Sequence, residues 1–239
     1  MFESFLTVEG ADGVGKSTQV QLLSERLRKH NREVHLLDFP SKCGSPIGDL
    51  IGSFLTGRHE GVTPEFLSLA FSIDRRSIIN DLENLKHSNP IFLSDRFVLS
   101  NIAFQCAKIS DPERKQQLEK LINWVEYKVL DLPRPTIEIV LIAPDAYFQA
   151  GAHLHRTGSL DRDYAQGQAD VHERQTGLQQ AVNSFYSSLE DTKALRKLNI
   201  CNPLGERKTA DELHSEVWQQ LSNMVQSPEL QGGTSDDDG

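Results

Sequence analysis

One segment of the chain combines residue types and spacing that suit phosphate chemistry. It follows an apolar run and reads Gly, four residues, then Gly-Lys-Ser, which fits the pattern of a phosphate-binding loop. Glycines let successive backbone N–H groups turn inward around an anion, and a helix that starts at the loop adds its N-terminal N–H groups and dipole. The pattern predicts a nucleoside triphosphate site formed by Gly10, Ala11, Asp12, Gly13, Val14, Gly15, Lys16, Ser17 and Thr18.

The lysine and the first hydroxyl of this segment have different expected roles. Lys16 would reach the β- and γ-phosphates of ATP, and Ser17 would ligate the Mg²⁺ that accompanies them. The alternative is a glycine-rich strand-to-helix turn without a ligand. The apolar run before the loop and the helical spacing after it supply the context that the motif requires, so we interpret the segment as a binding site.

The phosphate loop alone does not name an activity, because GTPase switches, motor ATPases and small-molecule kinases share it. A guanine-specific switch would need an Asn-Lys-x-Asp segment after a later strand, and the chain contains none. This absence disfavours the switch class. A kinase would need further residues that hold a second, anionic substrate beside the loop.

Two later segments could hold such a substrate. Phe71 and Arg75 are four residues apart in a predicted helix and therefore share a face. Asp95 and Arg96 follow the predicted strand Ile91–Leu93, at the sheet edge where open α/β folds bind ligands. Singly, Phe71 is more simply a core residue and the Asp-Arg pair a surface ion pair, but together they favour a substrate site. The polar residues that follow on the next helix are Ser100, Asn101 and Gln105.

The chain carries the periodicity of the elements that must bring these residues together. Apolar, often β-branched runs predict five strands, and apolar residues three and four apart predict helices between them. The alternation predicts an α/β fold with a parallel sheet covered on both faces. The predicted strands are Phe5–Val8, Val34–Leu37, Ile91–Leu93, Ile137–Ile142 and Leu198–Cys201, and the predicted helices include Gln19–His30, Pro64–Leu82 and Lys115–Leu130.

Length and composition predict one domain with a loop and a tail. The 239 residues suit a single compact domain, which we expect at residues 1–225. Residues 151–168 are polar and lack apolar periodicity, which predicts a long mobile loop. Residues 226–239 are polar and acidic, and we expect them to form a disordered tail.

Charge, hydropathy and cysteine content restrict which kinds of partner and which cellular location we expect. The net charge of −9 disfavours a nucleic-acid binder. No apolar run reaches the ~20 residues that span a bilayer, and the first residues show no targeting pattern, so we expect a cytoplasmic protein without a membrane partner. The three cysteines are odd in number and far apart, which predicts neither disulfides nor a zinc site.

With these segments in view, the chain resembles the thymidylate kinase family of phosphate-loop enzymes, which phosphorylate dTMP to dTDP. The similarity covers most of the chain, through FLTVEGADGVGKSTQ, DFPSKCGSPIG, LAFSIDRR, LSDRFVLSNIAFQCAK, LDLPRPTIEIVLIAP and ADVHERQTGLQQAVNSFYSSL in order. The resemblance implies a three-layer P-loop kinase fold with a five-stranded parallel sheet and a mobile lid at about residues 151–168. It also implies ATP, Mg²⁺ and dTMP as ligands, and a homodimer packed through helices.

The resemblance implies roles on the side of the acceptor nucleotide. Phe71 would stack on thymine, while Arg75 and Asn101 would hydrogen-bond its edge. Asp12 would face the sugar and the reacting phosphate, and Arg96 would hold the acceptor phosphate. The residues that would line the same site are Phe39, Ser100 and Gln105, and Asp95 would lie near Mg²⁺.

The chain departs from the family pattern at several positions. Lys42 stands where relatives often carry arginine, and a lysine is a point charge instead of a planar fork. Gly13 leaves the loop without a cation that some members place there, so Arg156 and Arg162 of the lid are the candidates for charge stabilisation. His172 stands where an aromatic residue often lies near the nucleotide, whereas His153 and His155 are interpreted as solvated loop residues.

The expected reaction is in-line transfer of the γ-phosphoryl group to dTMP, for which a loose transition state needs alignment and cations more than a base. The electrostatic work would fall to Lys16, Arg96, Arg156 and Arg162. Two other classes stay open. One is a kinase of the same fold for another nucleotide or nucleoside, and the other is a nucleotide-binding protein without catalysis.

Overall fold

The computed structural model describes residues 4–41, 45–56, 58–59, 61–82, 90–149 and 176–225. Its centre is one sheet of five strands in the order β2-β3-β1-β4-β5, and every neighbouring pair is parallel. This confirms the predicted α/β fold with a five-stranded parallel sheet. The strands are β1 (Ser4–Gly10), β2 (Val34–Asp38), β3 (Ile91–Asp95), β4 (Ile137–Ile142) and β5 (Leu195–Asn199).

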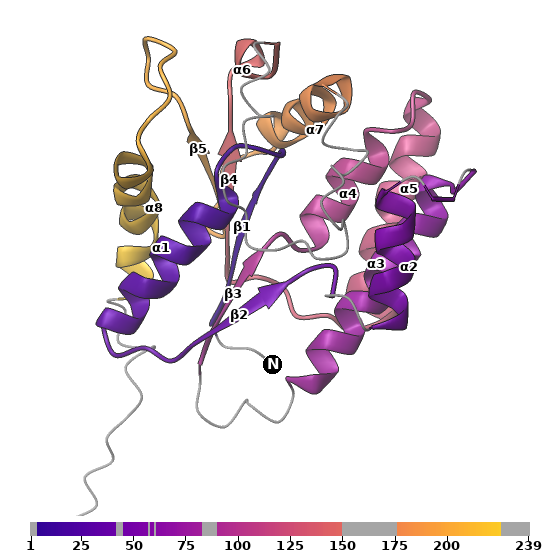
Figure 1. The fold of residues 1–239 in the computed structure, drawn as a ribbon, viewed down its shortest axis with the longest axis horizontal. Helices are drawn as coiled ribbons and strands as arrows, with labels where there is room; N and C mark the ends of the chain where they lie inside the picture. Colours follow the sequence, from indigo (N-terminus) through magenta and orange to yellow (C-terminus); the bar gives the residue numbers. More distant parts are fainter. Residues whose placement is uncertain are drawn as a thin grey trace, which may run out of the picture.

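Helices cover both faces of this sheet, which gives three layers (Figure 1). On one face lie α1 and α8, packed against each other. On the other face α4 and α7 contact the sheet, and α3 and α5 pack outside α4, with α2 beside α3. The helices are α1 (Lys16–Lys29), α2 (Pro46–Leu55), α3 (Pro64–Asp81), α4 (Val98–Cys106), α5 (Pro112–Trp124), the π-helical turn η2 (Val125–Val129), α6 (Asp145–Gln149), α7 (Thr176–Ser188) and α8 (Ala210–Val225).

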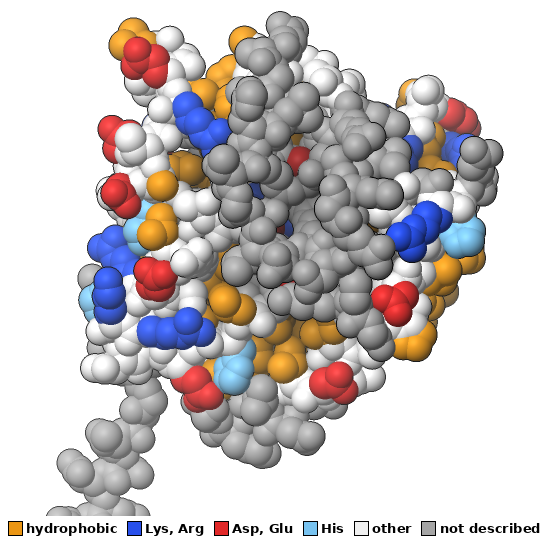
Figure 2. All heavy atoms as spheres, viewed as in Figure 1, with side chains coloured by type: hydrophobic (Ala, Val, Ile, Leu, Met, Phe, Trp, Pro, Cys, Tyr) orange, Lys and Arg blue, Asp and Glu red, His pale blue; other side chains and the backbone are white. Residues whose placement is uncertain are grey.

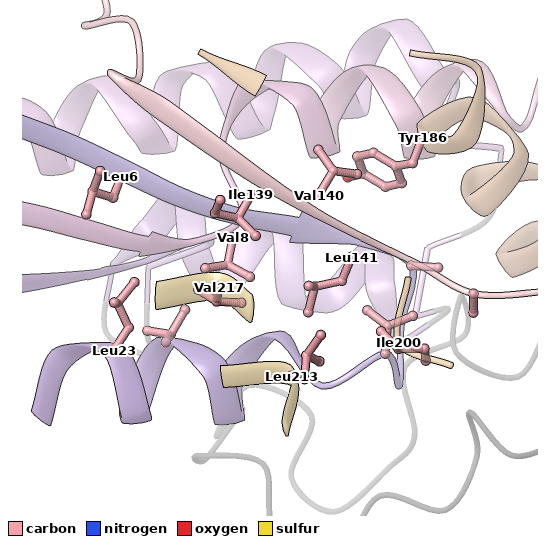
Figure 3. Packing of buried hydrophobic residues seen from close by; sticks show 14 of the residues in the cluster. Leu6, Val8, Leu23, Ile139, Val140, Leu141, Tyr186, Ile200, Leu213 and Val217 are labelled. Carbon is pink, nitrogen blue, oxygen red and sulfur yellow. The ribbon is translucent and has the colours of Figure 1, made fainter. Parts of the chain in front are cut away.

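The larger apolar core joins the sheet to α1 and α8 on one face and continues to α7 on the other. Leu23 of α1 points toward the strands, and Val217 of α8 lies next to Val8 of β1, while Leu213 of α8 lies near Leu141 of β4 (Figure 3). All five side chains are buried, and Leu23 is wholly inaccessible to water. Burial of apolar area is the main favourable term in folding, so this layer fixes where β1 and β4 end.

Three of the helices begin at sequence signals that are plain in the chain. Ser45, Thr63 and Asp111 each stand before a proline, and their side chains accept hydrogen bonds from backbone N–H groups of the first turn of α2, α3 and α5. Such caps satisfy donors that have no partner inside the helix, and proline at the first position loses nothing because its N–H would be unpaired there.

Three predicted elements have different boundaries in the structure. The fifth strand was expected at Leu198–Cys201, but β5 is Leu195–Asn199, because its register against β4 pairs Glu138 with Leu195 and Ile142 with Asn199. The helix expected at Lys115–Leu130 starts earlier, with α5 (Pro112–Trp124), and then continues as the π-helical turn η2. The helix expected at Gln19–His30 starts earlier as well, at Lys16.

The described surface is mixed in charge. On the face shown in Figure 2, basic and acidic side chains are interspersed and do not gather in one large patch of a single sign. Among the helices in the described ranges, none is both long and apolar enough to cross a bilayer. The lid at 151–168 and the tail at 226–239 lie outside the described residues.

Candidate active site

The phosphate loop joins β1 to α1 in a backbone conformation that needs glycine. Gly10, Gly13 and Gly15 have φ values of 143°, 79° and 102°, a region that residues with a Cβ rarely adopt. A Cβ on Gly10 would also lie 2.5 Å from the carbonyl oxygen of Leu141 on the neighbouring strand. The loop is therefore closed to larger residues at the point where the sheet ends.

The start of α1 has the features of an anion site. Its cap residue is Gly15, which offers no side-chain acceptor, and the first turn carries no acidic residue. The N-terminal N–H groups and the helix dipole are thus left without a negative partner from these sources. The ammonium of Lys16 folds over the loop and donates to the carbonyl oxygen of Ala11 at 2.7 Å. These groups suit a polyphosphate.

Asp95, at the end of β3, meets Ser17 of α1. The Ser17 hydroxyl donates to Oδ2 of Asp95 at 2.6 Å, while Oδ1 is buried and has no hydrogen-bond partner within the described part of the chain. A hydroxyl oxygen beside an unpartnered carboxylate oxygen fits Mg²⁺, which prefers oxygen ligands and is commonly held by one or two protein groups together with phosphates. In the described ranges there is no cluster of three or more His, Cys, Asp or Glu side chains that could hold a metal.

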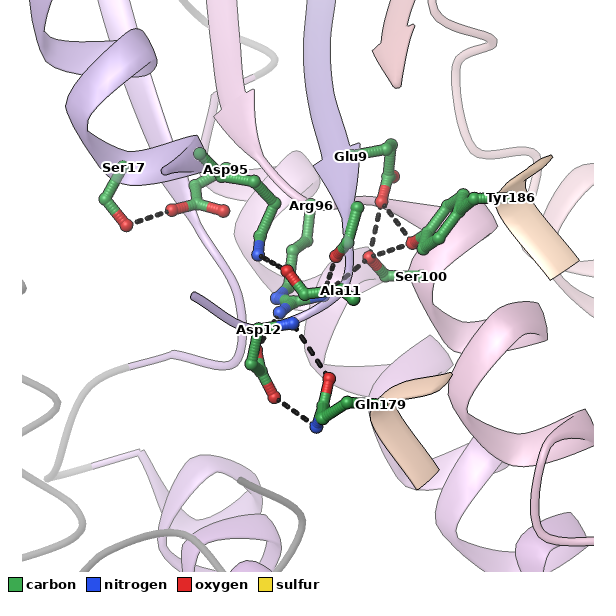
Figure 4. Close-up of polar contacts among 11 residues, drawn as sticks. Glu9, Ala11, Asp12, Ser17, Asp95, Arg96, Ser100, Gln179 and Tyr186 are labelled. Atoms are coloured by element: carbon green, nitrogen blue, oxygen red, sulfur yellow. Dashed lines mark hydrogen bonds and ion pairs between the residues drawn. The ribbon is translucent and has the colours of Figure 1, made fainter. Parts of the chain in front are cut away.

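Arg96 follows Asp95 directly, yet the two side chains go to different partners (Figure 4). The guanidinium of Arg96 forms an ion pair with Asp12 and donates to the Gly10 carbonyl oxygen at 3.1 Å and to Ser100 Oγ at 3.2 Å. Its backbone has a φ of 75°, a strained value for a residue with a side chain. Arg96 thus pairs with Asp12, whereas the pair considered from the sequence was a surface pair with Asp95, and the cation is fixed beside the loop.

Asp12 is held from two directions. Its Oδ2 accepts from Nε2 of Gln179 at 2.9 Å, and its backbone N–H donates to the side-chain oxygen Oε1 of Gln179 at 2.8 Å (Figure 4). Gln179 lies on α7, far from the loop in sequence. The pair ties the phosphate loop to the helix that follows the undescribed residues 150–175.

Behind Arg96 lies a second buried carboxylate, Glu9 of β1. It accepts hydrogen bonds from the Phe97 N–H at 2.7 Å, from Tyr186 Oη at 3.0 Å and from the Ser100 hydroxyl. Burial raises the pKa of Glu9 above its usual value, although these donors and the charge of Arg96 oppose the rise. Glu9 thereby orients Ser100, which in turn contacts the guanidinium of Arg96.

A further group of residues, some of them predicted to hold the acceptor nucleotide, lies on α3, α4 and η2. Arg75 of α3 is buried, with its guanidinium carbon 5.9 Å from the ring centre of Phe71 and equally far from Phe97. Its Nε and Nη2 donate to Glu126 of η2 at 2.7 and 2.5 Å. Asn101 of α4 donates to the same carboxylate at 2.7 Å. The shared helix face predicted for Phe71 and Arg75 is thus present, although Phe71 is only half-buried.

Of the remaining predicted site residues outside the phosphate loop, two lie within the described ranges and four lie outside them. Phe39 is buried and packs on Phe97 with ring centres 5.6 Å apart. Gln105 of α4 is buried, and its side-chain oxygen accepts a hydrogen bond from Nζ of Lys108 at 2.8 Å. Lys42, Arg156, Arg162 and His172 lie outside the described residues.

Sequence reasoning missed several residues that the structure adds. Gln179, Tyr186 and Glu126 contact predicted site residues, but no role was predicted for them, although Gln179 and Tyr186 lie in a segment that carries the family resemblance. Arg207, in the segment before α8, donates to the carbonyl oxygen of Gly13 at 3.3 Å, and Tyr147 donates to the same oxygen at 2.8 Å. A cation thus reaches the loop from another part of the chain, although residue 13 itself is glycine.

The fold and the site together define a P-loop phosphotransferase: a parallel sheet ends in a glycine-cradled anion site, flanked by a hydroxyl-carboxylate pair and a buried arginine. A model of a protein family described as "Thymidylate kinase" matches residues 8–133, which is more than half of the chain. The chain belongs to the thymidylate kinase family.

Individual relatives agree with this assignment. The chain is 30% identical to the thymidylate kinase of Mycobacterium tuberculosis H37Rv over 189 residues, which cover 77% of this chain and 84% of that protein. It is 35% identical to a probable thymidylate kinase of Thermococcus onnurineus over 149 residues, 59% of this chain and 66% of the other. The solved structure of thymidylate kinase from Candida albicans superposes with a TM-score of 0.68 at 25% identity, covering 92% of each chain.

Proposed function

We propose that the protein transfers the γ-phosphoryl group of ATP to the 5′-phosphate of dTMP by in-line displacement. Membership of the thymidylate kinase family carries the choice of substrates. The geometry supports two adjoining anionic sites: the loop with Lys16 on the donor side, and Arg96 with the Phe71–Arg75 group on the acceptor side. Arg96 and Asp12 lie where the two meet.

The chemistry needs positioning more than proton transfer. A phosphate monoester has a second pKa of about 6, so the attacking oxygen is already largely ionised at neutral pH. The transition state is loose, and its charge is stabilised by fixed cations. In this proposal Lys16 and Arg96 supply that charge within the described residues, and Arg156 and Arg162 supply more from the lid.

Ser17 and Asp95 would hold Mg²⁺. The observation that supports this assignment is Oδ1 of Asp95, which is buried beside the Ser17–Asp95 hydrogen bond and has no partner within the described residues. When bound, the ion neutralises charge on the β- and γ-phosphates. Asp12 and Gln179 fix the loop, and Glu9 with Ser100 fixes Arg96, so that the cation is in place before the nucleotides bind.

The location and the assembly belong to the same proposal. Cys106 and Cys201 are buried free thiols, which supports a reducing compartment such as the cytoplasm. Helix α3 exposes Phe66, Leu69 and Ile73 at helical spacing, which supports a homodimer that covers this apolar face. We further propose that residues 1–225 form one domain and that residues 226–239 form a separate acidic tail.

The proposal is tested by measuring dTDP formed from dTMP, ATP and Mg²⁺. Lys16→Ala and Arg96→Ala should each lower kcat by about 10³-fold or more, because each removes a cation from the developing charge. Matched controls are Lys120→Ala and Arg114→Ala, which remove exposed cations far from the loop in sequence and should leave the rate within about twofold.

Circular dichroism should show that all four variants are folded. Near wild-type rates in Arg96→Ala would remove it from the reaction. A wild-type protein that binds ATP but forms no dTDP would favour a nucleotide-binding protein without catalysis, and faster turnover of another monophosphate would favour a different kinase.

A further inference from the structure

Glu126 is a buried carboxylate that touches both residues proposed to read the base. It is inaccessible to water and accepts hydrogen bonds from Arg75 Nε at 2.7 Å, Arg75 Nη2 at 2.5 Å and Asn101 Nδ2 at 2.7 Å. The donors come from α3 and α4, whereas Glu126 comes from η2. One side chain therefore joins three elements at the acceptor side of the site.

The backbone around Glu126 is unusual in a way that suits this role. In η2 the N–H of Leu130 donates to the carbonyl oxygen of Val125 at 2.8 Å, which is the spacing of a π-helical turn. Such turns insert one residue into a helix and are frequent at functional sites. Here the turn buries Glu126 against Arg75 while Trp124 and Val129 on either side stay exposed.

The contacts of Asn101 fix the orientation of its amide. Its nitrogen donates to Glu126 and also to the carbonyl oxygen of Ser68 at 3.0 Å. Both partners are acceptors, so the reverse orientation would set oxygen against oxygen. The other end of the amide, Oδ1, is buried and has no donor within the described part of the chain. An unpaired buried acceptor is costly, and a ligand N–H would satisfy it.

The resulting pattern is a donor beside an acceptor. Arg75 offers N–H groups outside its pair with Glu126, because that pair engages only Nε and Nη2. Asn101 offers only an oxygen. Thymine and uracil present the complementary edge, with O4 as an acceptor and N3–H as a donor. Cytosine presents the opposite one, with an amino donor at C4 and an unprotonated N3.

We propose that Glu126 is a positioning residue that sets base specificity: by accepting from Arg75 and Asn101 together, it selects 4-keto pyrimidines over cytosine. The inference rests on the proposed dTMP kinase function. The charge of Glu126 also pairs directly with the buried cation of Arg75, beside which an uncharged base would lie. Glu126 acts through its two partners and need not touch the nucleotide.

The test replaces Glu126 by glutamine and compares kcat/KM for dTMP, dUMP and dCMP. Oε1 of Glu126 accepts from both Arg75 Nη2 and Asn101 Nδ2, and Oε2 accepts from Arg75 Nε. A glutamine has one oxygen, so its NH₂ must face either Arg75 Nε or the pair Arg75 Nη2 and Asn101 Nδ2, and it cannot accept from them. Arg75 and Asn101 are then no longer held together in one orientation. We expect kcat/KM for dTMP and dUMP to fall together by about tenfold or more, mainly through KM, because a hydrogen bond to a charged group is disrupted. The rate with dCMP should stay constant or rise.

This pattern separates base selection from a merely structural role. The ratio of dTMP to dUMP should not change, because the two differ by a methyl group that Glu126 does not affect, and KM for ATP should stay within about twofold. The control Glu119→Gln removes an exposed carboxylate from α5 and should change none of these ratios. Equal losses for all three acceptors, or no loss for any, would overturn the proposal.

A second variant guards against a failure to fold, since breaking a buried ion pair costs about 3–5 kcal/mol. Glu126→Asp keeps the charge but is one methylene shorter, so it cannot reach Arg75 and Asn101 at once. It should shift the dTMP-to-dCMP ratio in the same direction by a smaller factor, and an unchanged ratio would overturn the proposal. The wild-type rate with dTMP tests the proposed function and the variant ratios test Glu126, so the two failures are distinguishable.

Discussion

Buried carboxyl groups organise the site at the scale of single residues. Glu9, Asp12 and Glu126 are each buried, and each accepts hydrogen bonds from at least two side chains or backbone groups. A buried charge is tolerated only where such partners compensate for lost water. In all three cases the partner is a residue assigned to a substrate, so the compensation also fixes the site.

Glu138 of β4 differs from these three and gives a pH prediction. Burial, and then the charge of Glu9 on the neighbouring strand, raises the pKa of Glu138 to about 8, while Arg134 opposes the rise and Tyr127 is the other titratable group affected. A carboxyl whose pKa is raised by folding stabilises the protein fully below its unfolded pKa. This stabilisation is lost as the pH rises through the folded value.

The glutamine side chain of Glu138→Gln cannot ionise, so this variant does not lose stability as the pH rises through the pKa of the folded carboxyl. Its melting temperature should rise relative to wild type as the pH goes from 5 to about 8.5, and the two should approach each other at the acid end. Thermal unfolding followed by circular dichroism measures this, with Glu119→Gln as an exposed control. A difference between variant and wild type that is constant across this range would show that the Glu138 carboxyl does not titrate as described.

The site residues that the sequence could predict are those with a local signal. The phosphate loop is contiguous and needs glycine for steric reasons, and Asp95 with Arg96 stands at the end of an apolar strand. Glu126 and Gln179 could not be found in this way, because what defines them is a partner 51 or 167 residues away. Only the packing of α7 and η2 against the central strands and helices brings those pairs together.

At the scale of elements, the sheet edge explains the misplaced fifth strand. The run Leu198–Cys201 is more apolar than LRKLN, but β5 pairs with β4 alone and most of its residues are half-exposed. The apolar run therefore indicates the buried residue Ile200, which follows the strand, and does not indicate the strand itself. The π-helical turn was missed for a related reason, since apolar spacing does not reveal one inserted residue.

The packing of α1 against the sheet gives a stability prediction. Leu23 is wholly buried on α1, which packs against β1, β3 and α8, so Leu23→Ala should lower the free energy of unfolding by about 2–5 kcal/mol. The control is Leu204→Ala, whose leucine is 83% exposed and should matter by less than about 0.5 kcal/mol. Urea denaturation measures both. Equal midpoints for the two variants would mean that this core layer does not support the fold as described.

At the scale of the whole molecule, the parallel sheet collects the chemistry at one edge. β1 ends in the phosphate loop, β3 ends in Asp95 and Arg96, and the loop before α8 brings Arg207 to the same edge. Parallel strands place all their carboxyl ends together, so residues from distant segments converge there without further adjustment. The alternation of strands and helices predicts this convergence. It does not predict that Glu9, Tyr186 and Gln179 lie buried behind the loop and contact the site residues.

The outer face of α3 carries the last prediction, which concerns assembly. Phe66, Leu69 and Ile73 lie at positions i, i+3 and i+7 and are 51%, 39% and 53% exposed, so they form an apolar stripe on one side of the helix. A second copy of the chain would bury this stripe. Multi-angle light scattering should give about twice 26.8 kDa for the wild type.

Ile73→Glu places a charge at the C-terminal end of the stripe, on its most exposed residue, and should yield a folded monomer, because burying an unpaired carboxylate is unfavourable. Leu204→Glu adds the same charge at an exposed loop and should stay dimeric. A wild-type mass near 26.8 kDa would contradict the dimer, and a dimeric Ile73→Glu would place the interface on another face. Because Phe71 and Arg75 belong to the same helix, a monomeric variant should also show a raised KM for dTMP if contact with the second copy holds α3 in position.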